Sequence, residues 1–558
     1  MKSPARLGVL GSDADWSSLA KTLDITDESG LLQSLLLTFR TAGAKAYLYE
    51  PGYIDRDFSA AFSAFYSTLF RPYLKYCSRL HFFDVDISPV SHQPTAEHVS
   101  RALEDVAANY LGFVVIRPVA HAPIGVAVVS ADRLAMDPSI IIDTVAPYPV
   151  HVLGADLTVE GFPLTQQDTR VGACAQAAIW MAGRHFHAGH GGPWFSMPAI
   201  NEAALNPTDI LTTRSLPAGS EFLTPDNIVR ALRALDRHPV VQFARPDADT
   251  KKLIWTKPPQ NVVARYLDSG IPVLIGLRGR DGAVGHAVVA VGRVVREAMP
   301  SARSERSSTA DIVSHLLVND DQRGTCQRLP VAAADRTDAY PWTLEEDALW
   351  VMIPLPSKVF MTGDIAEELS RDLIEGFVNH ADKYRDRAQS SAPEDSPKLG
   401  PILNVDPSFY GVTPDQLVSR TYLTFGWKYK KRALRNQLPD PFKAELLGKH
   451  FPRYVWVTEF SLRDDLKGFD PCARKVRAHT VLDATGSKFF GESNLVAQIP
   501  GLGLFWTFDP ADPVASLGLS WRATNDAQPF RPKVRSWHDF DRCEIETKPD
   551  AEVNPDDA

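Results

Sequence analysis

The sequence predicts a protein of the α+β class, in which helices and mainly antiparallel strands occupy separate stretches of the chain. Between residues 151 and 360, helical patterns come first and apolar, strand-like runs follow them. Between residues 400 and 540, runs with strand character dominate. This order argues against a doubly wound parallel sheet, and a chain of 558 residues is long enough for about three or four domains.

The composition excludes several classes of protein. Hydrophobic residues make up 44% and charged residues 23%, as in ordinary globular proteins. The net charge of −9 does not favour nucleic acid as a partner. Apolar runs such as residues 348–355 are far shorter than the roughly 20 residues of a membrane span. The five cysteines are widely spaced and odd in number, so we expect a cytoplasmic protein without disulfides.

Residues 1–150 are predicted to form an N-terminal α/β region. Apolar residues at helical spacing predict helices over residues 30–44, 58–76 and 95–110. Two apolar runs, residues 112–118 and 125–129, predict strands.

Residues 151–362 are predicted to form a separate domain. We expect helices over residues 174–182, 225–234 and 260–267, and strands over 151–154, 272–277, 286–291, 315–318 and 349–353. Residues 363–399 are expected to form a helix (364–387) and a linker. Residues 400–540 are expected to form a β-rich region with strands over 454–460, 478–483 and 503–508, and residues 541–558 an acidic, disordered tail.

The first candidate for chemistry is Cys174, which follows a loop and precedes a stretch rich in alanine. We expect a helix to begin here. A cysteine at a helix N-terminus lies near the positive end of the macrodipole, which favours the nucleophilic thiolate. The alternative interpretation is a buried structural cysteine on an alanine-rich core helix.

Two further candidates flank apolar strands. His286 begins one strand directly after Gly285, and Asp320 follows another. An imidazole can exchange a proton with a thiol, and a carboxylate can hold that imidazole in one tautomer and stabilise its cation. Asn319 and Asp321 are alternatives for this last role. Taken singly, a histidine at a strand end and an acidic turn are also common structural features.

The chain order Cys174, His286, Asp320 resembles that of papain-like cysteine peptidases, in particular the bacterial C39-like family, over residues 151–360. As in that family, a glutamine precedes the cysteine, small residues follow it, a Gly-His-Ala-Val-Val run surrounds the base, and a glycine closes the acidic turn. The resemblance implies a papain-like core, in which the nucleophile helix packs on an antiparallel sheet. It also implies that Gln167 and the backbone N–H of Cys174 bind the oxyanion.

The sequence departs from the family pattern at three points. Asp321 stands where the family has proline. Gln167 lies seven residues before Cys174 and Gln166 lies eight, one or two more than in the family, and Gln166 remains an alternative oxyanion donor. A polar insert, residues 296–311, lengthens the separation of His286 and the acidic turn, and we expect it to be an exposed loop.

These residues predict a cysteine peptidase, a hydrolase that cleaves peptide or isopeptide bonds of a protein or peptide substrate through a thioester. No metal or organic cofactor is required, and the flanking regions are expected to select the substrate. The alternatives are a transferase of the same chemistry (acyltransferase, transglutaminase or deamidase) and a catalytically inactive, peptidase-like binding module. The sequence does not indicate an oligomeric state.

Two other clusters are weaker candidates. His185, His187 and His190 have the spacing of a zinc site, but we expect them in a loop near the cleft. The basic run at residues 428–435 is able to bind phosphate or an acidic partner, but a solvated helix face explains it better.

Overall fold

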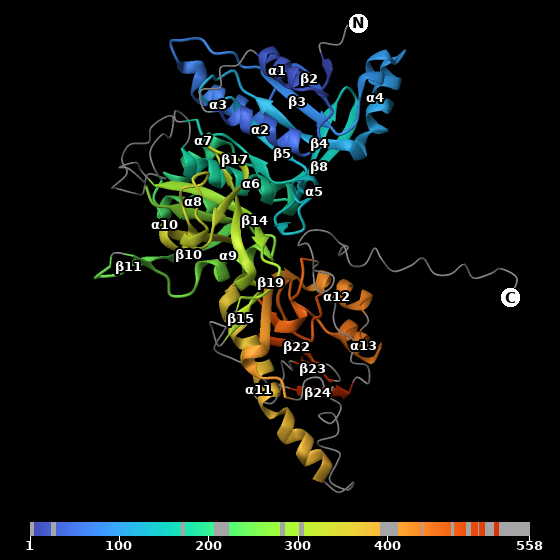
Figure 1. Cartoon of the computed structure of the whole chain (residues 1–558), viewed down its shortest axis with the longest axis vertical. Coiled ribbons are helices and arrows are strands. Elements are labelled where there is room, and N and C mark those ends of the chain that lie inside the picture. Colours follow the sequence, from blue (N-terminus) through green and yellow to red (C-terminus); the bar gives the residue numbers. More distant parts are fainter. Residues whose placement is uncertain are drawn as a thin grey trace, which may run out of the picture. The chain divides into compact units, whose positions relative to one another are not determined.

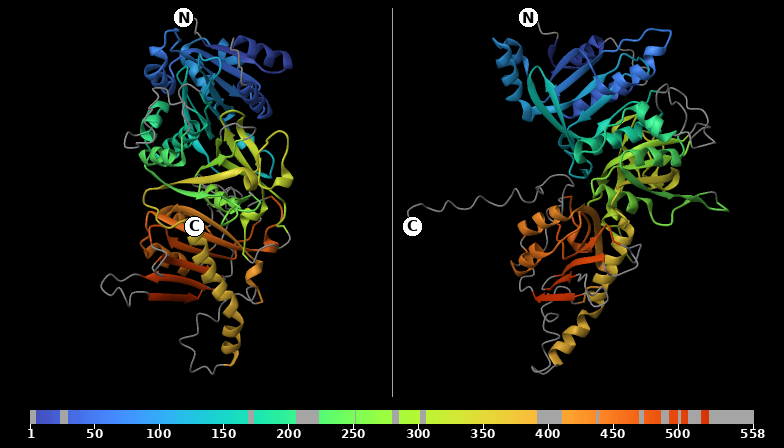
Figure 2. Two further views of the ribbon diagram at one scale, coloured as in Figure 1. Left: turned by 90° about the vertical axis from the view of Figure 1, so that its left-hand side faces the viewer. Right: turned by 180° about the vertical axis from the view of Figure 1, so that it is seen from behind.

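The structure is a computed structural model (Figures 1 and 2), which describes residues 5–23, 30–168, 173–205, 223–250, 252–279, 285–300, 306–390, 411–436, 438, 440–469, 474–486, 493–499, 502–507 and 518–523. Its contacts divide the chain into two compact units. Unit 1 comprises Met1–Pro259, Ile271–Val295 and Val313–Ser357, and unit 2 comprises Gln260–Gly270, Arg296–Ile312 and Lys358–Ala558.

This division differs from the boundaries expected from sequence. Residues 1–150 group with most of the following stretch, whereas two segments of the expected 151–362 domain belong to unit 2. The expected linker after residue 390 and the acidic tail, residues 541–558, lie outside the described residues.

Helices and antiparallel sheets are both abundant, which agrees with the α+β class. The first sheet of unit 1 has the strand order β1-β2-β3-β4-β5-β9, and each neighbouring pair is antiparallel. Its strands are β1 Arg6–Val9, β2 Ala46–Tyr53, β3 Cys77–Phe83, β4 Tyr110–Ile116, β5 Ile124–Val129 and β9 Pro163–Leu164. A separate hairpin consists of β7 Ala146–Val152 and β8 Ala155–Gly161.

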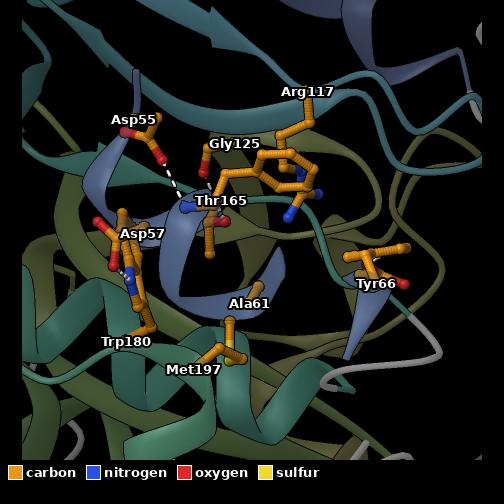
Figure 3. A pocket seen from close by; sticks show the side chains of 11 residues that line it. Asp55, Asp57, Ala61, Tyr66, Arg117, Gly125, Thr165, Trp180 and Met197 are labelled. Carbon is orange, nitrogen blue, oxygen red and sulfur yellow. Dashed lines mark hydrogen bonds between the residues drawn. The ribbon is translucent and has the colours of Figure 1, made fainter. Parts of the chain in front are cut away.

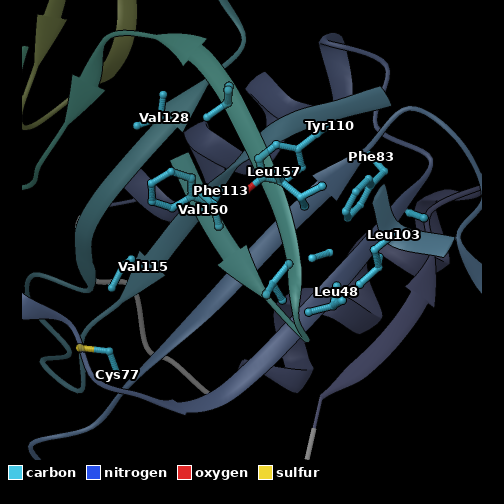
Figure 4. Close-up of a cluster of buried hydrophobic side chains, with 14 of the residues drawn as sticks. Leu48, Cys77, Phe83, Leu103, Tyr110, Phe113, Val115, Val128, Val150 and Leu157 are labelled. Carbon is cyan, nitrogen blue, oxygen red and sulfur yellow. The ribbon is translucent and has the colours of Figure 1, made fainter. Parts of the chain in front are cut away.

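A hydrophobic core joins this first sheet to the β7–β8 hairpin (Figure 4). Buried residues alternate with exposed ones along β8, as expected for a strand with one face on a core. Leu48, Phe83 and Val128 from the sheet and Val150 and Leu157 from the hairpin belong to one buried cluster.

The first helices of unit 1 are α1 Asp13–Thr22, α2 Leu31–Thr41, α3 Arg56–Ala64, α4 Ala96–Glu104 and α5 Ala131–Leu134.

The second sheet of unit 1 has the order β10-β18-β13-β14-β16-β17, with β6 beside β14. Its strands are β10 Arg237–Phe243, β18 Ala348–Pro356, β13 Val273–Leu277, β14 His286–Val295, β16 Val313–Asp320, β17 Gly324–Pro330 and β6 Ile140–Ile142. The helices of this part are α6 Cys174–His190, α7 Met197–Ala204, α8 Pro225–Ala234 and the short α10 Leu344–Asp347, and a small hairpin joins β11 Arg245–Pro246 to β12 Leu253–Ile254. Helix α6 contacts β14, which places the N-terminal residue of α6 and the first residue of β14 in one unit.

Unit 2 is built on one further sheet, β15-β19-β20-β21-β22-β23-β24. Its strands are β15 Ser307–Ser308, β19 Leu417–Phe425, β20 Tyr454–Leu462, β21 Ala478–Asp483, β22 Asn494–Ile499, β23 Leu502–Thr507 and β24 Gly518–Ala523. Its helices are α9 Pro259–Leu267, α11 Gly363–Ser390, α12 Gly426–Arg435 and α13 Asp440–Gly448.

Both faces of this sheet are covered. One buried cluster joins residues of α12 and α13 to Val455, Val457 and Val481, and another joins residues of α11 to Phe460 and Ala478. Neighbouring residues of a strand point to opposite faces, so α11 packs on one face and α12 and α13 on the other (Figure 1). Buried polar side chains add an ionic network, in which Arg420 pairs with Asp268 at 2.7 Å and with Glu459 at 3.4 Å.

Several expected elements have different bounds. The helix expected over residues 58–76 ends at Ala64, because Phe65 leaves the helical conformation (φ −135°, ψ −62°) and a short 3₁₀ turn, Tyr66–Thr68, follows. The helix expected over residues 95–110 ends at Glu104, and a short 3₁₀ turn, Ala107–Asn109, precedes β4. The helix expected over residues 174–182 continues to His190, because the residue suited to end it is Gly191, which adopts φ 65°.

Two corrections concern segments expected to be loops. His185, His187 and His190 lie on α6 rather than in a loop, and His185 is fully buried. The polar insert is not simply exposed: Ser307 and Ser308 form a buried strand parallel to β19. A polar segment is buried there because its groups have partners; the backbone carbonyl of Ser307 accepts a hydrogen bond from Arg371.

Among the described residues, no helix combines the length and the apolar character that a membrane span requires.

Candidate active site

Cys174 is the first residue of α6, as the sequence predicts. The preceding residue, Ala173, is the N-cap, and its backbone N–H donates to the Gln176 side chain at 3.2 Å. The thiol therefore lies beside the first N–H groups of a 17-residue helix, where a negative charge is stabilised. Cys174 is only 7% exposed.

His286 is the first residue of β14 and pairs across the sheet with Leu277 of β13. Its imidazole lies next to the Cys174 side chain, and this contact raises the pKa of His286. The structure thus brings together two residues that are 112 positions apart in the sequence (286 − 174). His286 is also 7% exposed, so solvent reaches little of either group.

Asp320 lies on the other side of the imidazole, at the end of β16, which neighbours β14 in the sheet. Its Oδ1 lies 3.1 Å from Nε2 of His286. The fully buried Asp320 carboxylate also accepts hydrogen bonds from the Gln322 backbone N–H at 2.9 Å and from the Tyr340 hydroxyl at 3.0 Å. These two donors hold the carboxylate in place.

A second carboxylate, that of Asp321, approaches the same imidazole nitrogen at 3.9 Å and is also fully buried. Among the described residues, neither of its oxygens has a hydrogen bond of good geometry. The backbone N–H groups of Asp321 and Gln167 are nevertheless close enough to favour the ionised form. Asp321 therefore links the imidazole to the segment that carries Gln167.

Electrostatics favour an imidazolium at His286. Burial alone would lower the pKa of His286, but the adjoining side chains of Asp320 and Cys174 and the charges of Asp320 and Asp321 together raise it well above its ordinary value. Burial would raise the pKa of Asp320. The interactions of its carboxylate with His286, Gln322 and Tyr340 outweigh burial and lower this pKa. Burial and the neighbouring Asp320 charge raise the pKa of Asp321 to about 7, against the attraction of His286.

Two aromatic residues of the site were missed by reasoning from the sequence. Trp342 stacks on the His286 ring, with centroids 5.5 Å apart and planes inclined by 28°. Its indole N–H donates to the Arg278 carbonyl at 3.0 Å, which fixes the ring. Tyr340 bonds to Asp320, as described above. The only signal in the sequence was a pair of aromatic residues two positions apart, which is too common to indicate a site.

The alternative residues for each role have other partners. The Gln166 side chain accepts a hydrogen bond from the Ile124 N–H at 3.0 Å, which ties it to β5. Asn319 donates to the Pro163 carbonyl and accepts from Thr325 and from the Cys326 N–H, so it connects the β16–β17 turn to β9. Gln167 is half-buried.

The described part of the chain contains one group of side chains able to share a metal ion, namely His286, Asp320 and Asp321. Their ligand atoms all lie within 4.8 Å of one another. The three histidines of α6 do not form such a group. The basic run lies on α12, where Arg432 is taken up by the interior ion pair with Glu459 at 3.0 Å, while Trp427 is exposed.

Comparisons with known proteins add little to this geometry. No protein-family model matches the chain, and no curated protein matches it. One solved structure that matches is the peptidase domain of Streptococcus ComA, a bi-functional ABC transporter involved in a quorum-sensing pathway. The match has 13% identity and a TM-score of 0.20, and covers 34% of this chain and 96% of that chain. Values at this level establish neither a shared fold nor a shared activity.

Proposed function

We propose that this chain is a papain-like cysteine hydrolase that cleaves peptide or isopeptide bonds. One observation carries the proposal. The buried His286 imidazole lies between the Cys174 thiol and the Asp320 carboxylate and contacts both. In this assignment Cys174 is the nucleophile, His286 the acid and base, and Asp320 the group that orients the imidazole.

The two ring nitrogens of His286 then have different roles. Nε2 faces Asp320, so Nδ1 is the nitrogen available to the thiol and to the substrate. Transfer of the thiol proton to this nitrogen gives a thiolate and an imidazolium. The raised pKa of His286 and the helix N-terminus at Cys174 both favour that ion pair.

The reaction proceeds by acyl transfer. The Cys174 thiolate attacks the carbonyl carbon, and a C–S bond forms while the carbonyl electrons move to oxygen. The intermediate collapses, the C–N bond breaks, and the leaving amine takes the proton of the His286 imidazolium, which leaves a thioester. Neutral His286 then accepts a proton from water as the water attacks the thioester. Loss of the carboxylic acid restores the thiolate–imidazolium pair.

We assign the oxyanion to the backbone N–H of Cys174 and the side chain of Gln167. Gln166 is the weaker choice because its side chain is bonded to β5. Removal of one oxyanion donor costs about 3–4 kcal/mol of transition-state stabilisation in enzymes of this kind. Asp321 is well placed to hold the Gln167 backbone.

Alkylation of the full-length protein by iodoacetamide tests the nucleophile. The reaction is followed from about pH 5 to about pH 9, and adducts are located by peptide mass. Cys174 should react faster than an ordinary thiol with its pKa near 8.5 and should still react below neutrality. His286→Ala should abolish the reaction at low pH. Cys77 is an internal control, because burial raises its pKa to about 12.

If Cys174 is no more reactive than Cys77, the activated nucleophile is wrong, and an inactive binding module becomes the better interpretation. If Cys174 is activated, the reaction type is tested with peptide mixtures. A hydrolase releases a new amine and incorporates ¹⁸O from water into the new carboxyl group, whereas an acyltransferase or transglutaminase requires an added amine. A deamidase releases ammonia. Cys174→Ala should abolish each of these products.

A further inference from the structure

A small pocket with both charged and apolar walls lies in unit 1 (Figure 3), and the proposed hydrolysis makes no use of it. Its walls come from the N-terminal part of α3, from the β4 and β5 region, and from α6 and α7. Its free volume is ≈ 30 Å³, which is two to three times the roughly 10–15 Å³ that one water molecule needs. The lining side chains that matter here are Asp55, Asp57, Tyr66, Arg117, Asp168 and Trp180.

Two of the three acidic side chains are already engaged. Asp57 accepts hydrogen bonds from the Trp180 indole N–H at 3.0 Å and from the Arg184 guanidinium. Asp168 accepts a hydrogen bond from the Tyr66 hydroxyl and lies 3.2 Å from the His121 ring. Side chains of the protein itself therefore bind the carboxylates of Asp57 and Asp168.

Asp55 and Arg117, in contrast, each have one charged-group atom that no described protein group contacts by a hydrogen bond. Asp55 is 6% exposed, and its Oδ1 accepts the Phe58 N–H at 2.7 Å. In the described part of the chain, no hydrogen bond or ion pair reaches its second oxygen, Oδ2. Arg117 is 9% exposed, and it donates from Nε to the Ala122 carbonyl and from Nη2 to the Gln166 carbonyl. Among the described residues, no acceptor forms a hydrogen bond with its Nη1.

These two opposite charges line one pocket, yet no ion pair joins them. A buried charge without a partner is costly, and proteins normally pair it. The arrangement fits a ligand that carries both complementary charges a few atoms apart. Trp180 and Tyr66 supply aromatic surface, which also favours a cation.

We propose that this pocket binds the zwitterionic head of a small α-amino acid, of the size of glycine or alanine. The ammonium group would donate to Oδ2 of Asp55, and the carboxylate would accept from Nη1 of Arg117. A simple anion would meet three carboxyl groups in the pocket, and a simple amine would leave Arg117 without an anion. The site does not depend on the proposed hydrolase activity.

Binding to the full-length protein is tested by titration calorimetry with four probes: glycine, alanine, ethylamine and acetate. Ethylamine carries only the positive charge and acetate only the negative charge. Glycine or alanine should bind saturably, in the micromolar to millimolar range expected for so few atoms. Each single-charge probe should bind at least about tenfold more weakly, as expected when one charge-assisted hydrogen bond is lost.

Asp55→Asn is the decisive variant, since asparagine is as good an N-cap as aspartate and should preserve α3. It should weaken glycine binding at least about tenfold. Arg117→Lys, which keeps the charge but loses the planar fork, should also weaken it. Asp249→Asn, at an exposed turn, is the matched control and should bind like the unmodified protein. The proposal is refuted if no probe binds, if ethylamine or acetate binds as tightly as glycine, or if a folded Asp55→Asn protein binds glycine normally.

Discussion

Replacement of Asp55 by asparagine should raise the stability of the protein at neutral and alkaline pH, in buffers free of amino acids. Burial, and then the nearby charge of Asp57, raise the pKa of Asp55 from 3.8 to about 6. An acid whose pKa is raised on folding binds more protons in the folded state than in the unfolded state between these two values. Stability therefore falls as pH rises from about 4 to about 6, and remains lower above that range.

The magnitude follows from the size of the shift. A difference of about two pKa units corresponds to about 3 kcal/mol, at about 1.4 kcal/mol per unit. Asparagine carries no charge and keeps the N-cap acceptor for the Phe58 N–H, so it avoids this loss. As the pH rises from about 4 to about 8, the free energy of unfolding of the variant should increase by up to about 3 kcal/mol relative to that of the unmodified protein.

Urea unfolding of both proteins at about pH 4 and about pH 8 measures this difference, because other carboxyl groups contribute equally to the two proteins. Hydrogen exchange of peptides from α3 shows whether the gain lies near Asp55. Asp249→Asn should show no such dependence on pH. If Asp55→Asn changes stability by the same amount at both pH values, Asp55 does not carry a buried charge at neutral pH, and the zwitterion site loses its basis.

Three further changes test other parts of the structure. Asp320→Asn should lower the pKa of His286, because the imidazolium loses its adjacent carboxylate charge, so the pH profile of Cys174 alkylation should lose its reactive arm at low pH; an unchanged profile would remove Asp320 from the proposed relay. Trp342→Ala should remove the indole face that stacks on the His286 imidazolium and stabilises its charge, and so slow alkylation below neutrality, whereas Trp342→Phe should retain most of the rate; equal rates in both variants would show that stacking is unimportant. Arg420→Leu should destabilise unit 2 by about 3–5 kcal/mol in urea unfolding, because the buried carboxylates of Asp268 and Glu459 both lose this cation and Glu459 keeps only Arg432; a loss below about 1 kcal/mol would contradict that role.

The sequence was informative where the signal is local. The start of α6 at Cys174 and the strand that begins at His286 were both predicted, because an alanine-rich run and an apolar run mark them directly. The strand before Asp320 was predicted for the same reason, although it continues through Asp320. The roles assigned to these residues remain proposals.

Features that depend on distant partners were not predicted. Nothing near Ser307 and Ser308 indicates that they join β19, more than 100 residues later. Trp342 follows Asp320 by only 22 residues (342 − 320), but its place on the imidazole depends on how the chain returns after β17. The unpaired charges of Asp55 and Arg117 were also invisible, because two solitary polar residues carry no pattern until a fold places them in one pocket.

The passage of the chain from one unit to the other has a consequence for synthesis on the ribosome. Asp268 belongs to unit 2, but its cation, Arg420, lies 152 residues later. At about 5–20 residues per second, Asp268 waits roughly 8–30 s before Arg420 has been translated. During that time residues 260–270, which lie between segments of unit 1 in the sequence, lack the part of their own unit that contains β19 and β20. The emerging chain therefore passes through a stage in which a segment destined for burial stays exposed, and this is the stage at which a chaperone would be most useful.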